Sequence, residues 1–204
     1  MIRRSIDLVF AILALIVLVP FFLLIALVVT LESSGPPFYG GRRVGLHGRE
    51  FRMWKIRTMV VDADRIGPGI TGKGDARITR VGALLRRTKL DELPQLVNLF
   101  AGDVTLVGPR AEVPSIVARY TGSQREILAV KPGIVGPGQI YYTTDQQDQI
   151  PEGAAADDYY VEHLLAPKLA IDMEYERRRT AWSDARIVLA TVGVVVRGLL
   201  GRHA

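Results

Sequence analysis

The chain has 204 residues, of which 49% are hydrophobic and 23% are charged, and its formal net charge is +5. This length suits one domain with a substantial core, and the composition excludes an intrinsically disordered chain. Because there is no cysteine, disulfides, thiolate metal sites and a cysteine nucleophile are all excluded. The positive charge predicts an anionic partner, which can be nucleic acid, phospholipid headgroups or a phosphorylated small molecule.

Residues 8–29, LVFAILALIVLVPFFLLIALVV, contain no charged side chain. About 20 apolar residues are enough for a helix to cross a bilayer. The run is longer than the usual core of a signal peptide, and no small-residue cleavage site follows it, so we expect a retained membrane segment. Residues 187–196 are also apolar, but they are too short to cross as a helix and are expected to form a core or interfacial helix.

Pro20 lies near the middle of the first apolar run, where it removes a main-chain N–H and its ring clashes with the preceding turn. Two topologies are open: a kinked helix that spans the membrane, or a helix that breaks and returns to the side from which it entered. Basic residues flank the run on both sides, with Arg3 and Arg4 before it and a cluster at 42–57 after it. Lys and Arg gather on the cytoplasmic side of membranes, but the second cluster starts over ten residues downstream, so charge alone leaves both topologies open.

From residue 35 onward the pattern predicts one soluble domain, composed mostly of helices with short extended segments. The glycines of residues 67–75 lack the spacing of a phosphate-binding P-loop, because Lys73 is followed by Gly74. Hydrophobic periodicity and turn residues predict helices over 77–89, 93–102 and 155–186, short extended segments at 50–59 and within 102–110, and a shaped loop at 131–138.

The segment 77–89, RITRVGALLRRTK, combines an apolar stripe with several basic side chains. One interpretation is a solvated charged face around a core stripe. The other is an amphipathic helix that lies on an anionic membrane and brings its arginines to phosphates. Since the same chain carries a membrane segment, we favour the second interpretation.

Two acids, Asp91 and Glu92, stand side by side after this basic segment. Adjacent residues on a helix point about 100° apart, so the two acids are not expected to share a proton. They could cap the helix that begins near Pro94. Alternatively, Arg86 and Arg110 bind phosphate, lower the pKa of a neighbouring carboxylate and keep it ionised for attack on phosphorus. The arginines and the membrane segment favour phosphoryl transfer at a bilayer surface.

Five motifs occur in a fixed order over nearly the whole chain: WKIRTM (54–59), RITRVGALLRRTKLDELPQL (77–96), GDVTLVGPR (102–110), KPGIVGPGQ (131–139) and KLAIDMEYERRRTAWSD (168–184). With these motifs the chain resembles the bacterial sugar transferase family, the monotopic phosphoglycosyl transferases. The resemblance implies transfer of a phosphosugar from a nucleoside diphosphate sugar, usually a UDP-sugar, to a polyprenol phosphate such as undecaprenyl phosphate. UMP is released, and the polyprenol diphosphosugar starts the synthesis of exopolysaccharide, lipopolysaccharide or another glycoconjugate.

The resemblance also implies roles for individual residues. Asp91 would be the nucleophile that forms a covalent phosphosugar enzyme, and Glu92 would assist as a base or a metal ligand. One of these two acids would hold Mg²⁺. Arg86 and Arg110 match phosphate-binding arginines of the family, and we add Lys55 and Arg57 of the first motif to the predicted phosphate-binding set. Pro20 corresponds to the break of a re-entrant membrane hairpin.

The chain departs from the family pattern at several places. The serine that often precedes the helix-breaking proline is Val19, and GPR is followed by Ala111 instead of proline. Residues 137–147 also differ, and because this segment is expected to contact the nucleotide sugar, the identity of the sugar does not follow from the resemblance. Tyr175 and Asp184 match frequent family positions, for which a structural and a catalytic role are both open.

We therefore predict a mainly α chain with short β segments, of the α+β class. Residues 1–34 are expected to form the re-entrant helix, broken at Pro20. Residues 35–204 are expected to form a small catalytic domain with amphipathic interfacial helices, on the cytoplasmic face of the bacterial inner membrane. The alternative is a non-catalytic membrane-surface module that recruits glycan enzymes or anionic lipid. No motif predicts a nucleic-acid partner.

Overall fold

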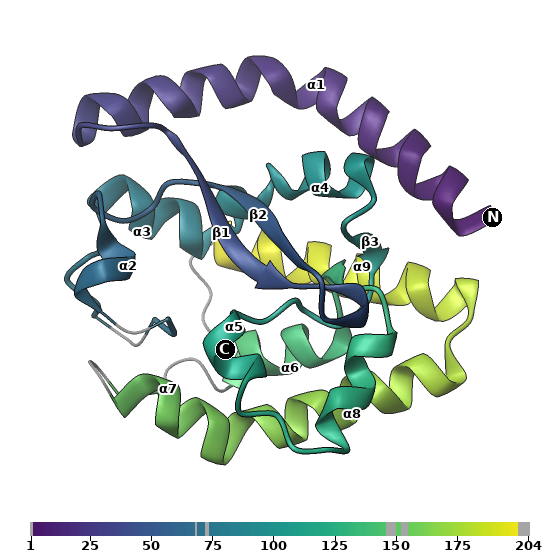
Figure 1. Ribbon diagram of the computed structural model, residues 1–204. Coiled ribbons are helices and arrows are strands. Elements are labelled where there is room, and N and C mark those ends of the chain that lie inside the picture. The colour runs from purple at the N-terminus through teal and green to yellow at the C-terminus, as the bar shows by residue number, and fades with distance from the viewer. Residues whose placement is uncertain (1, 68, 72–73, 146–149, 152–154, 200–204) are drawn as a thin grey trace.

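The computed structural model describes residues 2–67, 69–71, 74–145, 150–151 and 155–199, and these residues form mainly helices with two small sheets (Figure 1). The predicted α+β class is confirmed. The helices and helical turns are α1 (Ile2–Glu32), η1 (Leu46–Gly48), α2 (Ala63–Ile66), α3 (Arg80–Arg87), η2 (Leu90–Glu92), α4 (Gln95–Ala101), α5 (Pro114–Val117), η3 (Gln124–Ala129), α6 (Pro137–Asp145), α7 (Ala155–Tyr159), η5 (Tyr160–Leu164), α8 (Leu165–Arg178) and α9 (Ala181–Leu199). The strands are β1 (Phe38–Val44), β2 (Glu50–Ile56), β3 (Thr105–Val107) and β4 (Gly133–Val135).

Helix α1 arches across one side of the molecule, above α4 and the β1–β2 hairpin in Figure 1. From Arg4 to Glu32 it is long and apolar enough to cross a membrane. It continues through Pro20, so the predicted break is wrong for this structure. A helix can keep its course past a proline by losing one hydrogen bond and bending. Large apolar side chains are exposed along its length: Ile6, Val9, Phe10, Ile12, Leu13, Ile16, Val17, Val19, Leu23, Leu24, Leu27, Val28 and Leu31.

Both ends of α1 are bound to the rest of the chain by polar contacts. Near its start, Arg4 donates to the carbonyls of Leu99 (2.5 Å) and Phe100 (2.6 Å), both in α4. At its end, Glu32 accepts a hydrogen bond from the main-chain N–H of Val81 at 3.0 Å. Apolar packing adds to these contacts, because Ala11 joins one core cluster with Leu96, Leu99 and Val104, while Ile25 and Val29 join another with Ile56 and Leu85.

Strands β1 and β2 form an antiparallel hairpin in which Tyr39 lies opposite Lys55 and Arg43 lies opposite Phe51. Residues that face each other in an antiparallel pair project from the same face, and alternate residues project from opposite faces. Tyr39, Arg43 and Lys55 therefore share one face of the hairpin. Arg42, the residue before Arg43 on β1, projects from the other face and pairs with exposed Glu50 at 2.5 Å.

The second sheet joins two glycine-rich segments far apart in the sequence. Strands β3 and β4 pair in parallel, with Val107 opposite Val135. A Cβ at Gly133 would lie 2.1 Å from the main-chain nitrogen of Gly108, and one at Gly136 would lie 2.3 Å from its carbonyl oxygen. Only glycine permits this close approach, so the loop that ends at Arg110 is held firmly against β4 and the start of α6.

Three segments differ from the prediction. The helix expected over 155–186 is divided, because α8 ends at Arg178 and α9 begins at Ala181. The helix expected over 77–89 begins at Arg80, because Thr79 caps it by accepting a hydrogen bond from Gly82 N at 2.9 Å. Arg77 is therefore outside the helix, where it is buried and forms an ion pair with Asp75 at 2.6 Å. The loop expected at 131–138 contains β4 and the first residues of α6.

Candidate active site

The two acids lie in η2, the short turn between α3 and α4. Lys89, which precedes them, has φ 57°, a left-handed conformation that is strained for a non-glycine residue and often occurs at functional sites. No side chain caps α4, whose N-cap position is occupied by Pro94. The helix-cap interpretation of the acid pair is therefore wrong.

Glu92 is held by two cations from different parts of the chain. Its carboxylate accepts from Lys55 Nζ at 3.0 Å, and from Arg110 Nη2 at 2.6 Å and Nη1 at 3.1 Å. Burial alone would raise the pKa of Glu92, but the charges of Arg110 and Lys55 outweigh it and hold this pKa well below its usual range. Glu92 is therefore an ionised bridge between β2 and the loop after β3.

Asn98 in α4 fixes the position of β2 relative to the acids. Its Oδ1 accepts from Trp54 N at 2.9 Å, and its Nδ2 donates to the carbonyl of Arg52 at 2.7 Å and to Asp103 at 2.9 Å. These contacts satisfy a fully buried amide and place Lys55, the next residue after Trp54, beside Glu92. Asn98 was not predicted from the sequence, because a polar residue in a helix pattern gives no indication of a partner 44 residues away.

Asp91 is 5% exposed, and its Oδ1 makes no hydrogen bond with protein. Burial raises its pKa, against the opposing charge of Lys55, and the negative charge of Glu92 adds to the rise. The sequence had led us to expect a lowered pKa. The difference arises because Glu92, not Asp91, makes the direct contacts with the two cations, so burial dominates at Asp91.

Arg86 approaches the acids from the last turn of α3. Its Nε donates to Thr58 Oγ1 at 2.8 Å. Burial lowers the pKa of Arg86, partly offset by Asp91. Arg86, Lys55 and Arg110 thus surround Asp91 and Glu92 from three segments, and their binding of phosphate stays a prediction.

A second unpredicted residue, Gln139 in α6, orients Arg110. With its amide placed to satisfy both neighbours, Gln139 accepts from Arg110 Nη1 at 2.7 Å and donates to the carbonyl of Ile134 at 3.0 Å. The start of α6 is itself held by Asp172, which accepts from Gly138 N at 2.9 Å. Burial raises the pKa of Asp172 to about 6. Segment 137–147 was expected to contact substrate, which stays a prediction. Residues 146 and 147 lie outside the described residues, and within the described part Gln139 contacts Arg110.

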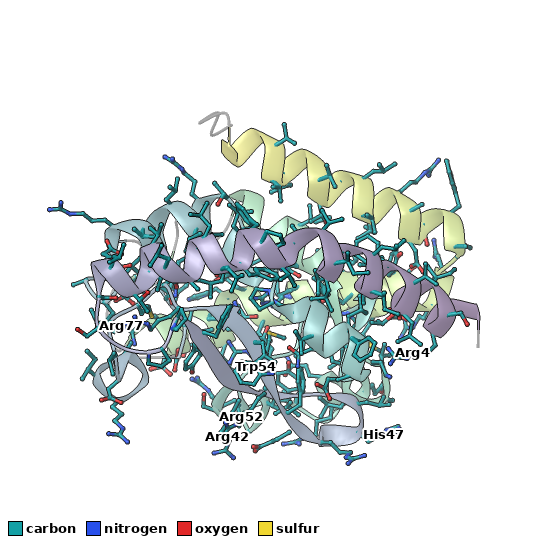
Figure 2. The ribbon with its side chains drawn as sticks, turned by 90° about the horizontal axis from the view of Figure 1, so that it is seen from above. Arg4, Arg42, His47, Arg52, Trp54 and Arg77 are labelled. Carbon is teal, nitrogen blue, oxygen red and sulfur yellow. The ribbon has the colours of Figure 1, made fainter. Side chains whose placement is uncertain are left out.

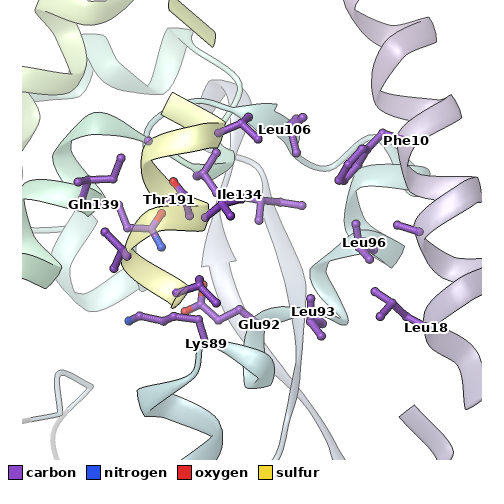
Figure 3. A pocket seen from close by; sticks show the side chains of 18 residues that line it. Phe10, Leu18, Lys89, Glu92, Leu93, Leu96, Leu106, Ile134, Gln139 and Thr191 are labelled. Carbon is purple, nitrogen blue, oxygen red and sulfur yellow. The ribbon is translucent and has the colours of Figure 1, made fainter. Parts of the chain in front are cut away.

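An apolar cavity of about 280 Å³ opens beside the acids, between α1, α4, α9 and the β4–α6 segment. Figure 3 shows Lys89 and Glu92 at one end of it, with Phe10 and Leu18 of α1 on one side and Thr191 of α9 on the other. Apolar side chains form most of the wall, including Leu93, Leu96, Leu106, Ile134 and Ile140. Helix α1 therefore contributes directly to a cavity that ends at a catalytic candidate.

Comparison with known proteins assigns the family. Residues 1–198 match the model of the family described as bacterial sugar transferase. The chain belongs to the bacterial sugar transferase family.

Several relatives of this bacterial sugar transferase have functional names. A UDP-N-acetylgalactosamine-undecaprenyl-phosphate N-acetylgalactosaminephosphotransferase of Aeromonas hydrophila is 33% identical, over 98% of this chain and 45% of that protein. A UDP-glucose:undecaprenyl-phosphate glucose-1-phosphate transferase of Caulobacter vibrioides is 36% identical, over 93% of this chain and 68% of that protein. The exopolysaccharide production protein ExoY of Sinorhizobium fredii is 34% identical, over 95% of this chain and 84% of that protein. The chain thus spans about half the length of the first relative and most of the last.

Among the described residues of this bacterial sugar transferase, the acid pair can be compared with what Mg²⁺ requires. The described part of the chain holds no group of three or more His, Asp or Glu side chains that could bind a metal. Mg²⁺ commonly uses one or two carboxylates together with waters and substrate phosphates. Both oxygens of Glu92 already accept from cations, whereas Asp91 Oδ1 accepts no hydrogen bond from protein. The donor set therefore fits an ion held mainly by substrate phosphates, with Asp91 as its protein ligand.

Arg57 of the predicted phosphate-binding set lies elsewhere. Its guanidinium donates to the carbonyls of Ser33 (2.7 Å), Ser34 (2.9 Å), Gly35 (3.2 Å) and Pro36 (2.8 Å). These bonds fasten the end of α1 to β2, so the contacts of Arg57 are structural. Pro20 lies within α1 and is not one of the residues around the acids, so its contribution is to the course of that helix.

Tyr175 and Asp184 also have structural contacts in the transferase. Tyr175 Oη donates to Asp184 Oδ1 at 2.6 Å, and Arg179 Nε donates to the same oxygen at 2.8 Å. Arg179 Nη2 donates in addition to the carbonyl of Val107 at 2.6 Å. The cluster joins the turn between α8 and α9 to β3, and so supports the loop that carries Arg110.

Proposed function

We propose that this bacterial sugar transferase moves a phosphosugar from a UDP-sugar to undecaprenyl phosphate and releases UMP. The observation that carries the proposal is a buried carboxylate, Asp91, with an oxygen that has no protein partner, beside cations that Glu92 only partly neutralises. The names of the relatives support these two substrate classes. The product, a polyprenol diphosphosugar, would begin the synthesis of an exopolysaccharide or a related glycoconjugate at the membrane.

The proposed reaction has two steps at one phosphorus atom. A carboxylate oxygen of Asp91 attacks the β-phosphorus, and the bond from this phosphorus to the oxygen that bridges it to the α-phosphate breaks. UMP leaves with that oxygen and its electron pair, and the sugar phosphate remains on Asp91. A phosphate oxygen of undecaprenyl phosphate then attacks the same phosphorus, and Asp91 leaves as a carboxylate.

The cations and Glu92 have complementary parts in this scheme. Lys55, Arg86 and Arg110 stabilise the charge on the phosphoryl oxygens as each bond breaks. When bound, Mg²⁺ neutralises part of the charge of the diphosphate. The acceptor phosphate, with a second pKa of about 6, is largely ionised at neutral pH and needs no general base. We therefore assign Glu92 to the positioning of Lys55 and Arg110, which it already contacts.

The apolar cavity is the proposed site for the first part of the polyprenol chain. It ends at Glu92 and Lys89, which would place the phosphate of the acceptor beside Asp91. A polyprenol is longer than a cavity of about 280 Å³, so the remainder of the lipid would follow the exposed apolar side chains of α1 into the bilayer.

We also propose that α1 enters the membrane without crossing it, from the cytoplasmic face of the inner membrane. A straight helix of 31 residues would be about 46 Å long, enough to cross a hydrocarbon core of about 30 Å. Yet Arg4 and Glu32, near its two ends, both bind the same domain. A single domain on one side of a bilayer can hold both ends only if the helix returns to that side.

The reaction is tested with the full chain purified in lipid nanodiscs, supplied with Mg²⁺ and with UDP-glucose, UDP-galactose or UDP-N-acetylgalactosamine. Without acceptor, intact-protein mass spectrometry should show an adduct of one sugar phosphate, and undecaprenyl phosphate should then remove it. Asp91→Asn should form no adduct. The matched control is Asp62→Asn, at an exposed aspartate that pairs only loosely with Arg65 (3.8 Å). UMP release that persists in Asp91→Asn would contradict the role of Asp91.

The topology is tested with single cysteines, which the absence of native cysteine makes unambiguous. Ser5 and Ser34 are exposed near the two ends of α1. In oriented membrane vesicles, Ser5→Cys and Ser34→Cys should react with a membrane-impermeant thiol reagent from the same side. Labelling from opposite sides would rule out the re-entrant topology.

A further inference from the structure

The inner face of the β1–β2 hairpin carries charged and aromatic side chains that the proposed reaction does not yet use. Lys55 projects from this face and contacts Glu92. Tyr39 lies directly opposite Lys55, and Arg43 lies four residues further along β1, on the same face. Arg43 thus lies on the same face of the hairpin as Lys55, which the proposed reaction assigns to phosphate binding.

Between Tyr39 and Arg43, Gly41 leaves a notch, which is a gap in the row of side chains on this face. A Cβ at Gly41 would lie 2.9 Å from Tyr39 Cε1 and 3.5 Å from Arg43 Nη1. The phenol ring and the guanidinium therefore converge above the main chain of one residue that has no side chain. An aromatic ring beside an arginine, over a flat stretch of strand, offers a stacking surface and a phosphate ligand together.

Arg43 is half-buried, yet among the described residues it has no carboxylate within ion-pair distance. Its one hydrogen bond runs from Nη1 to the carbonyl of its neighbour Arg42 at 2.9 Å. Burial lowers the pKa of Arg43, and the positive charge of Arg110 lowers it further. The two acids nearest to this pair are engaged elsewhere, Glu92 with Lys55 and Arg110 and Glu112 with Lys168. Arg110 is thus paired with Glu92, whereas Arg43 remains a half-buried cation without an acidic partner among the described residues, as expected of a side chain that binds an anion.

We propose that Tyr39 and Arg43 bind the nucleoside monophosphate half of the donor, with Arg43 on the α-phosphate and Tyr39 against the nucleoside. This inference rests on the proposed function, because it divides the donor of that reaction between two groups of residues. Arg110, Lys55 and Arg86 hold the phosphoryl group that is transferred, and Arg43 holds the one that leaves as UMP.

The location of the cavity explains why the nucleotide, and not the acceptor, is assigned to the hairpin. No residue of β1 or β2 lines the apolar cavity beside Glu92. The cavity wall is formed by α1, α4, α9 and the segment from β3 to α6. The lipid acceptor therefore approaches along that wall, while the face with Tyr39 and Arg43 is left for a polar, aromatic ligand.

The decisive variant is Arg43→Gln, with Arg42→Gln as the matched control. Arg42 is the adjacent arginine of the same strand, it projects from the outer face, and it lies opposite Arg52 on β2 (Figure 2). Calorimetric titration of UMP with Mg²⁺ into the full chain in nanodiscs should show a Kd about 10- to 100-fold higher for Arg43→Gln, as expected for a lost charged hydrogen bond. Arg42→Gln should bind UMP like the unchanged protein.

A second variant, Gly41→Ala, tests the same site in case Arg43→Gln does not fold. Gly41→Ala fills the notch, and the added methyl meets only side-chain atoms, those of Tyr39 and Arg43, so the fold should persist while UMP affinity falls. In the transfer assay, Arg43→Gln should raise the KM for the UDP-sugar by a similar factor and leave the KM for undecaprenyl phosphate unchanged. An unchanged Kd for UMP in Arg43→Gln, or a raised acceptor KM with an unchanged donor KM, would overturn the inference.

The titration also separates this inference from the proposed function. If the unchanged protein binds UMP and Arg43→Gln weakens that binding, the nucleotide site stands even where no sugar phosphate is transferred. If transfer occurs and Arg43→Gln has the kinetics of the control, the reaction stands and the nucleotide site is wrong.

Discussion

Two buried ion clusters lie two residues apart along the chain, at Arg110 and at Glu112, and they differ in how completely they are paired. Glu112 accepts from Tyr160 Oη at 2.6 Å and from Lys168 Nζ, which also bonds Tyr160. The rings of Tyr142 and Tyr160 lie 5.4 and 5.3 Å from the same ammonium group. One positive and one negative charge thus pair beside two tyrosine rings, and no atom of Glu112, Lys168 or Tyr160 is among the buried side-chain atoms that lack a hydrogen-bond partner.

The cluster around Asp91 and Glu92 has an excess of cations and an unpaired carboxylate oxygen. A closed, neutral cluster such as that of Glu112 makes the core rigid. A cluster that leaves a buried polar atom without a partner lowers the stability of the fold, and such clusters are commonly found where a protein binds a ligand or catalyses a reaction. The comparison shows that burial and charge do not by themselves mark an active site. These two clusters differ instead in whether a buried carboxylate oxygen is left without a hydrogen-bond partner.

The largest effect is expected for Asp91→Asn, which tests the open cluster. The transfer rate should fall by at least about 10³-fold, because the amide is not a nucleophile. The unfolding temperature should stay the same or rise, because the variant no longer buries a carboxyl group that burial disfavours in its charged form. UMP release and thermal unfolding on the same sample measure both quantities. If Asp91→Asn instead lowers the unfolding temperature and is inactive because it is unfolded, the Asp91 cluster has a structural role like that of the Glu112 cluster.

Lys168→Met tests the closed cluster and should affect stability instead. It leaves Glu112 buried without a cation, at a cost of about 3–5 kcal/mol in the free energy of unfolding. Denaturant unfolding measures this loss, and the KM of the remaining folded enzyme for the UDP-sugar should be unchanged. In the double variant Lys168→Met/Glu112→Gln, part of the stability should return. A loss below about 1 kcal/mol in the single variant would show that this cluster is not the structural one.

Asp172 connects the two clusters, since it lies one helical turn after Lys168 and holds the start of α6, where Gln139 contacts Arg110. Burial raises the pKa of Asp172 to about 6 from its ordinary value of 3.8. A folded-state pKa above the unfolded value gives stability that is complete below about pH 4 and is lost as the pH rises through about 6. That change amounts to about 2–3 kcal/mol.

The check is the free energy of unfolding of Asp172→Asn minus that of the unchanged protein, measured from pH 4 to pH 7.5. The difference should move in favour of the variant as the pH rises, because asparagine does not titrate. A difference that is constant over this range would show that Asp172 keeps an ordinary pKa and does not couple the two clusters to pH.

The smallest effect is expected at Thr58, whose hydroxyl accepts from Arg86 at the edge of the open cluster. Thr58→Val keeps the shape of the side chain and removes the acceptor, which should cost about 1 kcal/mol of stability. The kcat/KM for the UDP-sugar should fall only a few-fold, because Arg86 keeps its charge. An effect as large as that of Asp91→Asn would mean that the orientation of Arg86, and not its charge, is what the reaction needs.

Several features could be predicted from the sequence, because they depend on local pattern or on motifs. The apolar run at 8–29 predicted a long N-terminal helix, and the periodicity after residue 77 predicted two helices that the structure contains, with bounds shifted by up to three residues. The motifs assigned the family. The pattern failed at Pro20, where the helix continues, because packing of Ile25 and Val29 against Ile56 and Leu85 supports the second half of the helix.

The role of an individual charged residue was not a local property. Arg57 and Lys55 stand in one motif, yet one binds the carbonyls at the end of α1 and the other binds Glu92. They stand two residues apart, and Arg57 follows the last residue of β2, Ile56. Which neighbours the two side chains contact depends on segments 20 to 40 residues away in the sequence. Asn98 and Gln139 were missed for the same reason.

By itself the sequence determined the class of fold, the presence of an apolar helix of membrane length and the family, because composition, periodicity and spaced motifs are properties of the chain. Only the tertiary structure decided which acid is paired and which is open, that Arg43 faces the site while Arg42 does not, and that both ends of α1 bind one domain. Each of these depends on burial and on distances between segments far apart in sequence, and those determine where a charge is compensated and where it remains to bind a ligand.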